Sequence, residues 1–161
     1  MRKSSTLKRM CYTINDIGGF LATTFSWQHP GRESLKLELE MNGDSITDVK
    51  MKARGCLSFL LFSQKMKASL KGPAQNLDLP HGHSHSELIW KEMIQRIQNQ
   101  WKDPINHKEL CHCRQVDADV VDRAVVYGAH TVEDIRKRTS ANTGCATCLP
   151  DVQKVLKNRL A

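Results

Sequence analysis

The run CHCRQVDADVVDRAVVYGAHTVEDIRKRTSANTGCATCLPDVQKVL, residues 111–156, decides how the C-terminal part of the chain folds. Cys111 and Cys113 open it, and Cys145 and Cys148 stand near its end, after 31 intervening residues. Apolar residues recur at helical spacings in three stretches of this region, each too short to form a stable helix alone in water. These helices need a common anchor, and four thiolates that converge on one metal centre would supply it.

Two kinds of metal centre accept four thiolates, a single Zn²⁺ ion and a [2Fe-2S] cluster. Structural zinc sites typically use pairs of the C-x₂₋₄-C kind, and the C-x-C pair here is tighter. Helices that begin near Asp117 and Pro150 would direct N-terminal amide groups at a cluster that is a net dianion, an argument that also suits a zinc tetrathiolate. The residues therefore favour [2Fe-2S] and leave zinc as the alternative.

The first 30 residues bear on the cellular compartment. Residues 1–30 are polar and aperiodic, and we predict a basic, poorly ordered leader without an export cleavage site. No stretch approaches the roughly 18 to 20 apolar residues that a membrane-spanning helix needs. We therefore expect a cytoplasmic protein with no membrane attachment, in which paired cysteines bind metal in preference to forming disulfides.

The charge balance is basic but diffuse. Lysine and arginine number 24 against 17 acidic residues, a net charge of +7, and the excess is spread over all regions of the chain. Basic and aromatic residues are not interleaved as in nucleic-acid binders, so nucleic acid is not an expected partner. No pairing of a nucleophile with a base is apparent either, and we expect no enzymatic activity.

The N-terminal half alternates in the manner of a half-buried sheet. Apolar and charged residues alternate over 35–41 and again over 49–54, with Asn42-Gly43-Asp44 as the turn of a hairpin. Helical spacings follow over 57–70 and 86–101, separated by a polar loop. The pattern predicts an α+β protein in which a small sheet with packed helices, residues 31–103, precedes the cysteine-bearing domain, residues 108–161.

The cysteine-bearing run resembles the [2Fe-2S] domain of bacterioferritin-associated ferredoxin, which also occurs as the central domain of NifU. The shared features are C-x-C-R at Cys111–Arg114, a GA-x-T turn at Gly128–Thr131, TGC-x-x-C at Thr143–Cys148 and the proline at Pro150. The resemblance implies a small all-α domain whose four cysteines, Cys111, Cys113, Cys145 and Cys148, bind a [2Fe-2S] cluster. Ser140, Asn142 and Ala146 stand where that family tends to have glycine.

The preceding domain resembles the NifU/IscU scaffold on which clusters are assembled. The features are the hairpin, the Ala53-Arg54-Gly55-Cys56 step into a helix, and the histidine-containing loop before an amphipathic helix. The resemblance implies a vestigial metal site of Cys56, His85 and Glu33. Gly31 and Ser86 occupy the positions of the family's other two cysteines, so such a site would bind iron or a nascent cluster weakly.

Together these resemblances imply an iron–sulfur protein of cluster assembly or delivery, whose partners are assembly proteins or a redox protein. The chain could also pair with a second copy of itself. One alternative is a ferredoxin-type electron-transfer module, for example for the release of iron from ferritin. Another is a structural zinc adaptor.

Overall fold

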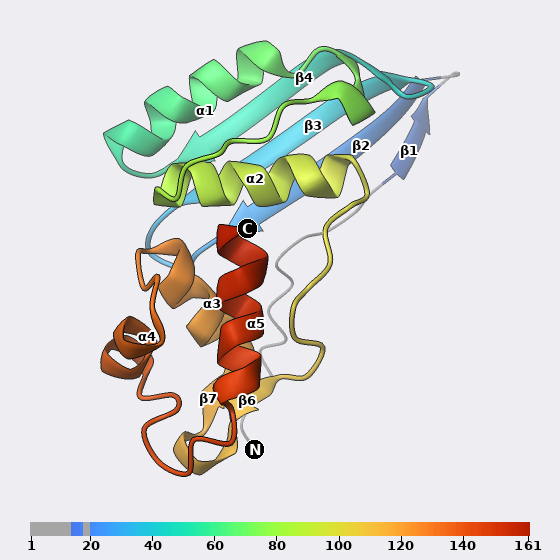
Figure 1. Ribbon diagram of the computed structural model, residues 1–161. Coiled ribbons are helices and arrows are strands. Elements are labelled where there is room, and N and C mark those ends of the chain that lie inside the picture. Colours follow the sequence, from blue (N-terminus) through green and yellow to red (C-terminus); the bar gives the residue numbers. More distant parts are fainter. Residues whose placement is uncertain (1–13, 18–19) are drawn as a thin grey trace, which may run out of the picture. The chain divides into compact units, whose positions relative to one another are not determined.

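The computed structural model describes residues 14–17 and 20–161 (Figure 1). The described residues form two compact units, one made of those up to Leu79 together with Trp90–Gln100, and the other of Pro80–Ile89 with Trp101–Ala161. The first contains a sheet and helices, and the second is mainly helical, so the protein is α+β. Residues 80–89, which the sequence placed within a domain of residues 31–103, group with the second unit.

The sheet of the first unit is antiparallel, in the order β1-β2-β3-β4-β5. Its strands are β1 (Ile14–Ile17), β2 (Phe20–Gln28), β3 (Ser34–Asn42), β4 (Ser45–Arg54) and β5 (Gly72–Pro73). The expected hairpin is formed by β3 and β4, in which Leu37 lies opposite Met51. The apolar positions of β3 point into the core, because Leu35, Leu37 and Leu39 are almost completely buried.

Strand β2 corrects the prediction of a poorly ordered leader over residues 1–30. Residues 20–28 pair with β3 along most of their length, and Phe25 and Trp27, two residues apart, are both buried. Ser26 alone separates these aromatic residues, and Ala22, Thr23 and Thr24 precede them, so the period-2 pattern is present but weak in hydropathy. Residues 1–13 and 18–19 of the predicted leader lie outside the described residues.

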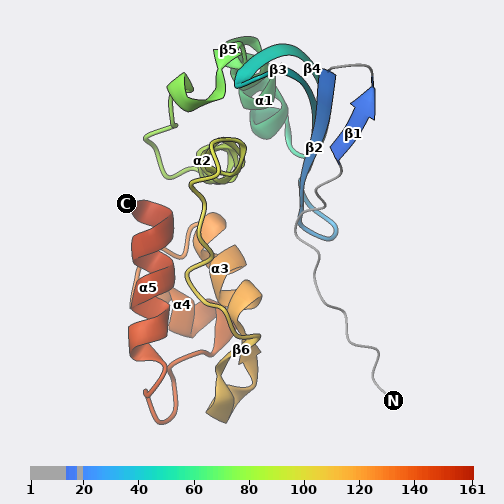
Figure 2. The same cartoon turned by 90° about the vertical axis from the view of Figure 1, so that its right-hand side faces the viewer.

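Helices α1 (Leu57–Ser69) and α2 (His85–Ile97) lie on the same side of the sheet in both views (Figures 1 and 2). Trp90 of α2 is fully buried, and its indole N–H donates to the Ser63 hydroxyl of α1 at 2.9 Å. Helix α2 begins one residue before the expected range of 86–101, because its N-cap Ser84 exchanges hydrogen bonds with Glu87 as a capping box. The helix ends before residue 101, and Asn99 adopts a positive φ of 56°.

The second unit contains three complete α-helices and a short ribbon. Its elements are β6 (Glu109–Cys111), β7 (Val116–Asp117), α3 (Ala118–Val126), α4 (Val132–Thr139) and α5 (Leu149–Leu160). The ribbon corrects the expectation of an all-α domain. Two strands of two and three residues carry no recognisable alternation, and they pair because the C-x-C turn between them brings their backbones together.

A single apolar core joins the helices of this unit. Val121 and Val125 of α3, Ile135 of α4, and Val152 and Val155 of α5 are completely buried in it. Thr131 and Asp134 form a capping box at the start of α4. The buried guanidinium of Arg159 donates to both carboxylate oxygens of Asp122, at 2.8 and 2.6 Å, and ties the last turn of α5 to α3.

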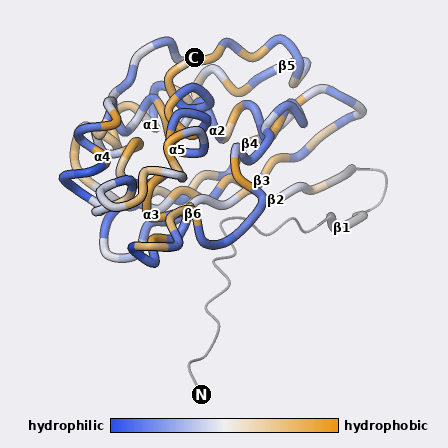
Figure 3. The backbone as a smooth tube through the Cα atoms, turned by 60° about the horizontal axis from the view of Figure 1, so that its bottom comes forward, coloured by the Kyte–Doolittle hydropathy of each residue, from blue (hydrophilic) through white to orange (hydrophobic). Residues whose placement is uncertain are grey.

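Within the part of the chain that the structure describes, none of the helices has the length and apolar character needed to cross a membrane. The tube in Figure 3 switches repeatedly between hydrophilic and hydrophobic colours along the chain.

Left-handed backbone recurs around the cysteine loops. Ser140, Asn142 and Ala146 have φ values of 63°, 60° and 58°. The family that this run resembles tends to have glycine at these three positions, and a side chain in this conformation costs about 1–2 kcal/mol, least for asparagine. The loop between α4 and α5 therefore folds against a local backbone preference.

Replacing Ala146 by glycine is expected to raise the free energy of unfolding of the second unit by about 1 kcal/mol, because it removes the Cβ from a left-handed residue. Ala146 is exposed, so the change removes little packing. Urea titration followed by circular dichroism, at equal metal content, measures the effect. As a control, Ala124→Gly inside α3 should lower stability by about 1 kcal/mol. An Ala146→Gly protein that is less stable than the parent would contradict the strain.

Candidate metal centre

The four predicted sulfur ligands come from two loops of the second unit. Cys111 ends β6, Cys113 lies in the single helical turn that follows, and Cys145 and Cys148 precede α5. The Sγ atoms of Cys111 and Cys113 lie 3.7 Å apart. Hydrogen-bonding contacts also link Cys111 to Cys148 and Cys113 to Cys145. The structure thus brings the four sulfurs side by side.

Backbone N–H groups point at these sulfurs. The amide of Asn142 donates to both Cys111 and Cys148, and the amide of Arg114 also donates to Cys111. Cys145 receives the amide of Thr147 and contacts the Thr147 hydroxyl, whose Oγ1 lies 3.2 Å from the sulfur. Donors of this kind stabilise a thiolate over a thiol, so the loops favour the ionised sulfur that a metal requires.

The pKa values of the thiols diverge accordingly. The hydroxyl and then the backbone of Thr147, followed by the Cys113 thiol, lower the pKa of Cys145 to about 7. Burial raises the pKa of Cys148. Burial also acts to raise the pKa of Cys111, but the hydrogen bonds from Asn142, Cys148 and Arg114 hold it below its usual value.

The centre is asymmetric in its exposure to solvent. Cys111 and Cys148 are buried, at 1% and 6% exposure, whereas Cys113 and Cys145 are exposed. The loop passes so close that a Cβ on Gly144 would lie 3.0 Å from the sulfur of Cys113. A donor set made of four thiols and surrounded by N–H groups fits a thiolate-ligated cluster that carries net negative charge.

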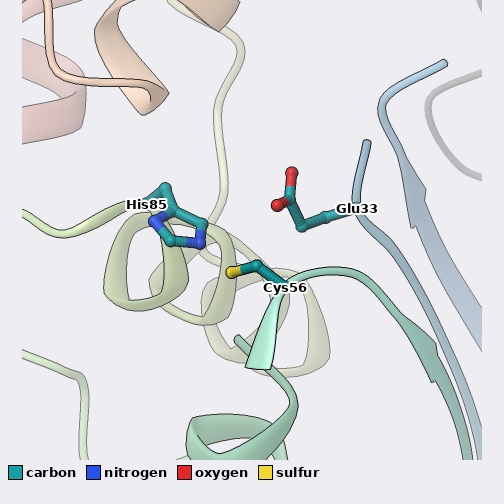
Figure 4. A group of neighbouring side chains, drawn as sticks. All are labelled: Glu33, Cys56 and His85. Atoms are coloured by element: carbon teal, nitrogen blue, oxygen red, sulfur yellow. The ribbon is translucent and has the colours of Figure 1, made fainter. Parts of the chain in front are cut away.

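A second group of candidate ligands lies at one end of the sheet of the first unit (Figure 4). One ligand atom from each of Glu33, Cys56 and His85 lies within 4.8 Å of the other two. Glu33 precedes β3, Cys56 precedes α1 and His85 begins α2. Helix α2 is continuous, and its residues 90–97 belong to the unit of Glu33 and Cys56, so the helix itself carries His85 to this position.

The three side chains differ in exposure and support. Glu33 is buried at 4% exposure, His85 is half-buried and Cys56 is exposed, with its sulfur 3.1 Å from the Ser58 hydroxyl. Glu33 packs directly on Gly55, where a Cβ would lie 2.7 Å from the Glu33 Cγ. The absence of a side chain at residue 55 therefore makes room for the carboxylate beside Cys56.

Two contributors to the cysteine centre, Asn142 and Thr147, had no functional role assigned from the sequence. Asn142 and Thr147 act on the sulfurs through backbone amides, which every non-proline residue possesses, so the sequence carried no chemical signal for them. Arg114, the last residue of the C-x-C-R motif and a candidate to offset cluster charge, donates through its side-chain Nε to the Thr143 hydroxyl of the other cysteine loop at 2.9 Å.

In the reduced, metal-free protein, iodoacetamide is expected to modify Cys145 faster than Cys113 at pH 7, although both are exposed, because Cys145 is then about half thiolate. The rate at Cys145 should fall about tenfold for each pH unit below 7 as the thiolate is protonated. Peptide mass spectrometry resolves the two sites. The Thr147→Val variant, which lacks the hydroxyl donor, should react more slowly at Cys145. Equal rates at Cys145 and Cys113 would contradict the assignment.

Comparison with known families gives the cysteine centre its cofactor. Residues 110–158 match the model of the BFD-like [2Fe-2S] binding domain. The match spans all four cysteines, and it decides between the two centres that the ligand set left open, in favour of [2Fe-2S] over zinc.

One protein named as a redox enzyme is similar to part of this chain. The large subunit of nitrite reductase (NADH) from Escherichia coli (strain K12) is 38% identical over 53 residues, which are 33% of this chain and 6% of that protein. No solved structure matches the chain. Residues 110–158 therefore form a BFD-like [2Fe-2S] binding domain, with a [2Fe-2S] cluster as its cofactor.

Proposed function

We propose that the chain is an iron–sulfur protein of cluster assembly or delivery. In this proposal, the C-terminal cysteines hold a [2Fe-2S] cluster, and Glu33, Cys56 and His85 form a reduced scaffold site that takes iron in transit. The observation that carries the assembly role is the proximity of these three side chains, which come from three separate segments of the chain. Their positions are those that the resemblance to the NifU/IscU scaffold assigned.

The protein's own contribution at the cluster site is to hold charge and to leave one edge open. Cys111 and Cys148 would anchor the cluster on the buried side, and Cys113 and Cys145 would bind it where solvent and partners have access. The amide of Asn142, directed at both buried sulfurs, offsets negative charge that water does not reach. When bound, the cluster supplies one-electron redox chemistry and an iron–sulfur unit that can be passed on.

The scaffold site would take a different cargo. One thiol, one imidazole and one carboxylate form a mixed donor set that suits Fe²⁺ or Zn²⁺ and contains too little sulfur to retain a cluster. Three protein ligands also leave coordination positions for water or an exchanging ligand. The site therefore fits weak, transient binding of a single divalent ion.

Electron transfer is the second candidate function. The similarity to part of a nitrite reductase (NADH) large subunit favours it, as does the exposed edge at Cys113 and Cys145. In that case the first unit would serve for docking, and the partner would be a redox protein in place of an assembly protein. Both candidates give the chain a carrier role without turnover of its own, in the cytoplasm, as a single chain or a homodimer.

Replacing Cys111 or Cys145 by alanine is expected to abolish the visible ferric–thiolate absorption and the bound iron and sulfide of anaerobically purified protein, because each provides one of the four cluster ligands. The Cys56→Ala variant is the matched control, and it should keep the cluster. Iron and sulfide analysis with absorption spectroscopy measures both. A cluster retained in the Cys145→Ala protein would contradict the assignment of Cys145 as a cluster ligand.

Anaerobic Fe²⁺ titration of the cluster-loaded full chain tests the scaffold site, with calorimetry as the readout. The wild-type protein should bind one further ion, and Cys56→Ala or His85→Ala should weaken this binding at least about tenfold, because each removes one of three ligands. His81→Ala, which removes an exposed histidine from the same loop, should leave binding unchanged. Cluster transfer to an apo-ferredoxin, followed by circular dichroism, then tests delivery. Rapid electron exchange without further Fe²⁺ binding or cluster transfer would replace assembly by the second candidate.

A further inference from the structure

An open pocket adjoins the exposed edge of the cysteine centre. Its volume is about 450 Å³, and it lies between α4 and the loop that precedes α5. The lining residues are Glu133, Arg136 and Lys137 from α4, and Asn142, Thr143, Gly144 and Ala146 from the loop. Gly144 links the pocket to the centre, because this residue approaches the exposed sulfur of Cys113.

The charged groups around this pocket are mainly positive. Arg136 donates through Nε to the carbonyl of Asn142 at 3.1 Å, which fixes its guanidinium at the wall. The guanidinium of Arg114, from the other cysteine loop, is held near the pocket by its hydrogen bond to the Thr143 hydroxyl. Lys137 is 70% exposed, and its Nζ lies 3.7 Å from an oxygen of Glu133. Glu133 is itself 58% exposed and lies 3.7 Å from Arg136, so it is a loosely held partner for two cations.

The three cations differ in how much freedom they keep. Hydrogen bonds to the loop orient both guanidinium groups, whereas the long side chain of Lys137 extends into solvent. Oriented guanidinium groups bind carboxylates well because little entropy is lost on contact, and a mobile ammonium adds longer-range attraction. One carboxylate on an approaching partner could thus displace Glu133 and contact Arg136 and Lys137.

We propose that this pocket and the adjoining cysteine edge form the docking surface for an acidic segment of a partner protein. A carboxylate of the partner enters the pocket between Arg136 and Lys137, and this contact places the partner against Cys113 and Cys145. The inference rests on the cluster-binding domain alone, and it holds whether the cluster serves assembly or electron transfer. Binding of this kind weakens as salt screens the charges.

A competing explanation is that the cations only offset the negative charge of the cluster. The two explanations differ in what a charge reversal at Lys137 changes. Loss of a docking contact lowers the affinity for an acidic ligand and leaves the cluster in place. Loss of charge compensation makes the cluster less stable and leaves the affinity for an acidic ligand as it was.

The experiment measures the binding of fluorescein-labelled hexaglutamate to the cluster-loaded full chain by fluorescence anisotropy, with cluster absorption recorded in the same samples. Lys137→Glu should weaken binding about tenfold or more, since it exchanges an attraction for a repulsion, with cluster absorption unchanged. Lys157→Glu is the matched control, because Lys157 is also an exposed lysine in the last turn of a helix. It should change the affinity less than about twofold.

Further readouts separate the outcomes. Hexaglutamine should not bind, and about 500 mM salt should abolish the binding of hexaglutamate. Equal weakening by Lys137→Glu and Lys157→Glu would overturn the proposal in favour of a general attraction to a basic protein. Wild-type affinity in a Lys137→Glu protein that loses its cluster would overturn it in favour of charge compensation.

Discussion

The second unit depends on the closure of a 31-residue segment between two pairs of cysteines. Closure costs chain entropy, and four sulfurs that repel one another when ionised must then share a small volume. The conformation of the loop before α5 offsets part of both costs. Left-handed residues turn the loop at Ser140, Asn142 and Ala146, and the turns direct the Asn142 amide at both buried sulfurs. Helices α3, α4 and α5 share one apolar core with the buried cysteines Cys111 and Cys148. The packing of the helices and the geometry of the metal centre therefore depend on each other.

Much of the fold could be predicted because its elements alternate strongly. The β3–β4 hairpin and helix α2 show clear periods of two and about 3.6 residues, and each lies close to where its pattern places it. Strand β2 was missed because alanine, threonine and serine flank Phe25 and Trp27 and weaken the alternation in hydropathy along the strand. The β6–β7 ribbon was missed for another reason, since pairing between such short strands follows from the turn that joins them.

The candidate sites were predictable to the extent that side chains carry their chemistry. Paired cysteines in the sequence indicate thiolate ligands. A family resemblance indicated Glu33, Cys56 and His85, and ligand atoms of these three residues lie close together in the structure. Backbone hydrogen-bond donors cannot be identified from residue types. The amides that donate to the sulfurs could therefore be found only from the conformation of the loops. The pocket beside α4 was equally hidden. Residues 136–138 are a run of basic residues, and such runs are usually solvent-exposed helix faces without a specific role. Only the structure shows that the loop before α5 lies opposite this run and closes a pocket with it.

The packing of Glu33 on Gly55 links the history of two positions that are 22 residues apart. A methyl group at residue 55 would collide with the Glu33 side chain and with the ring of Phe59, so the glycine can be exchanged only after both side chains have moved or been replaced. Loss of the acidic residue alone does not free residue 55, because the phenylalanine ring still occupies the space. A lineage that keeps either side chain in place inherits the glycine as a condition.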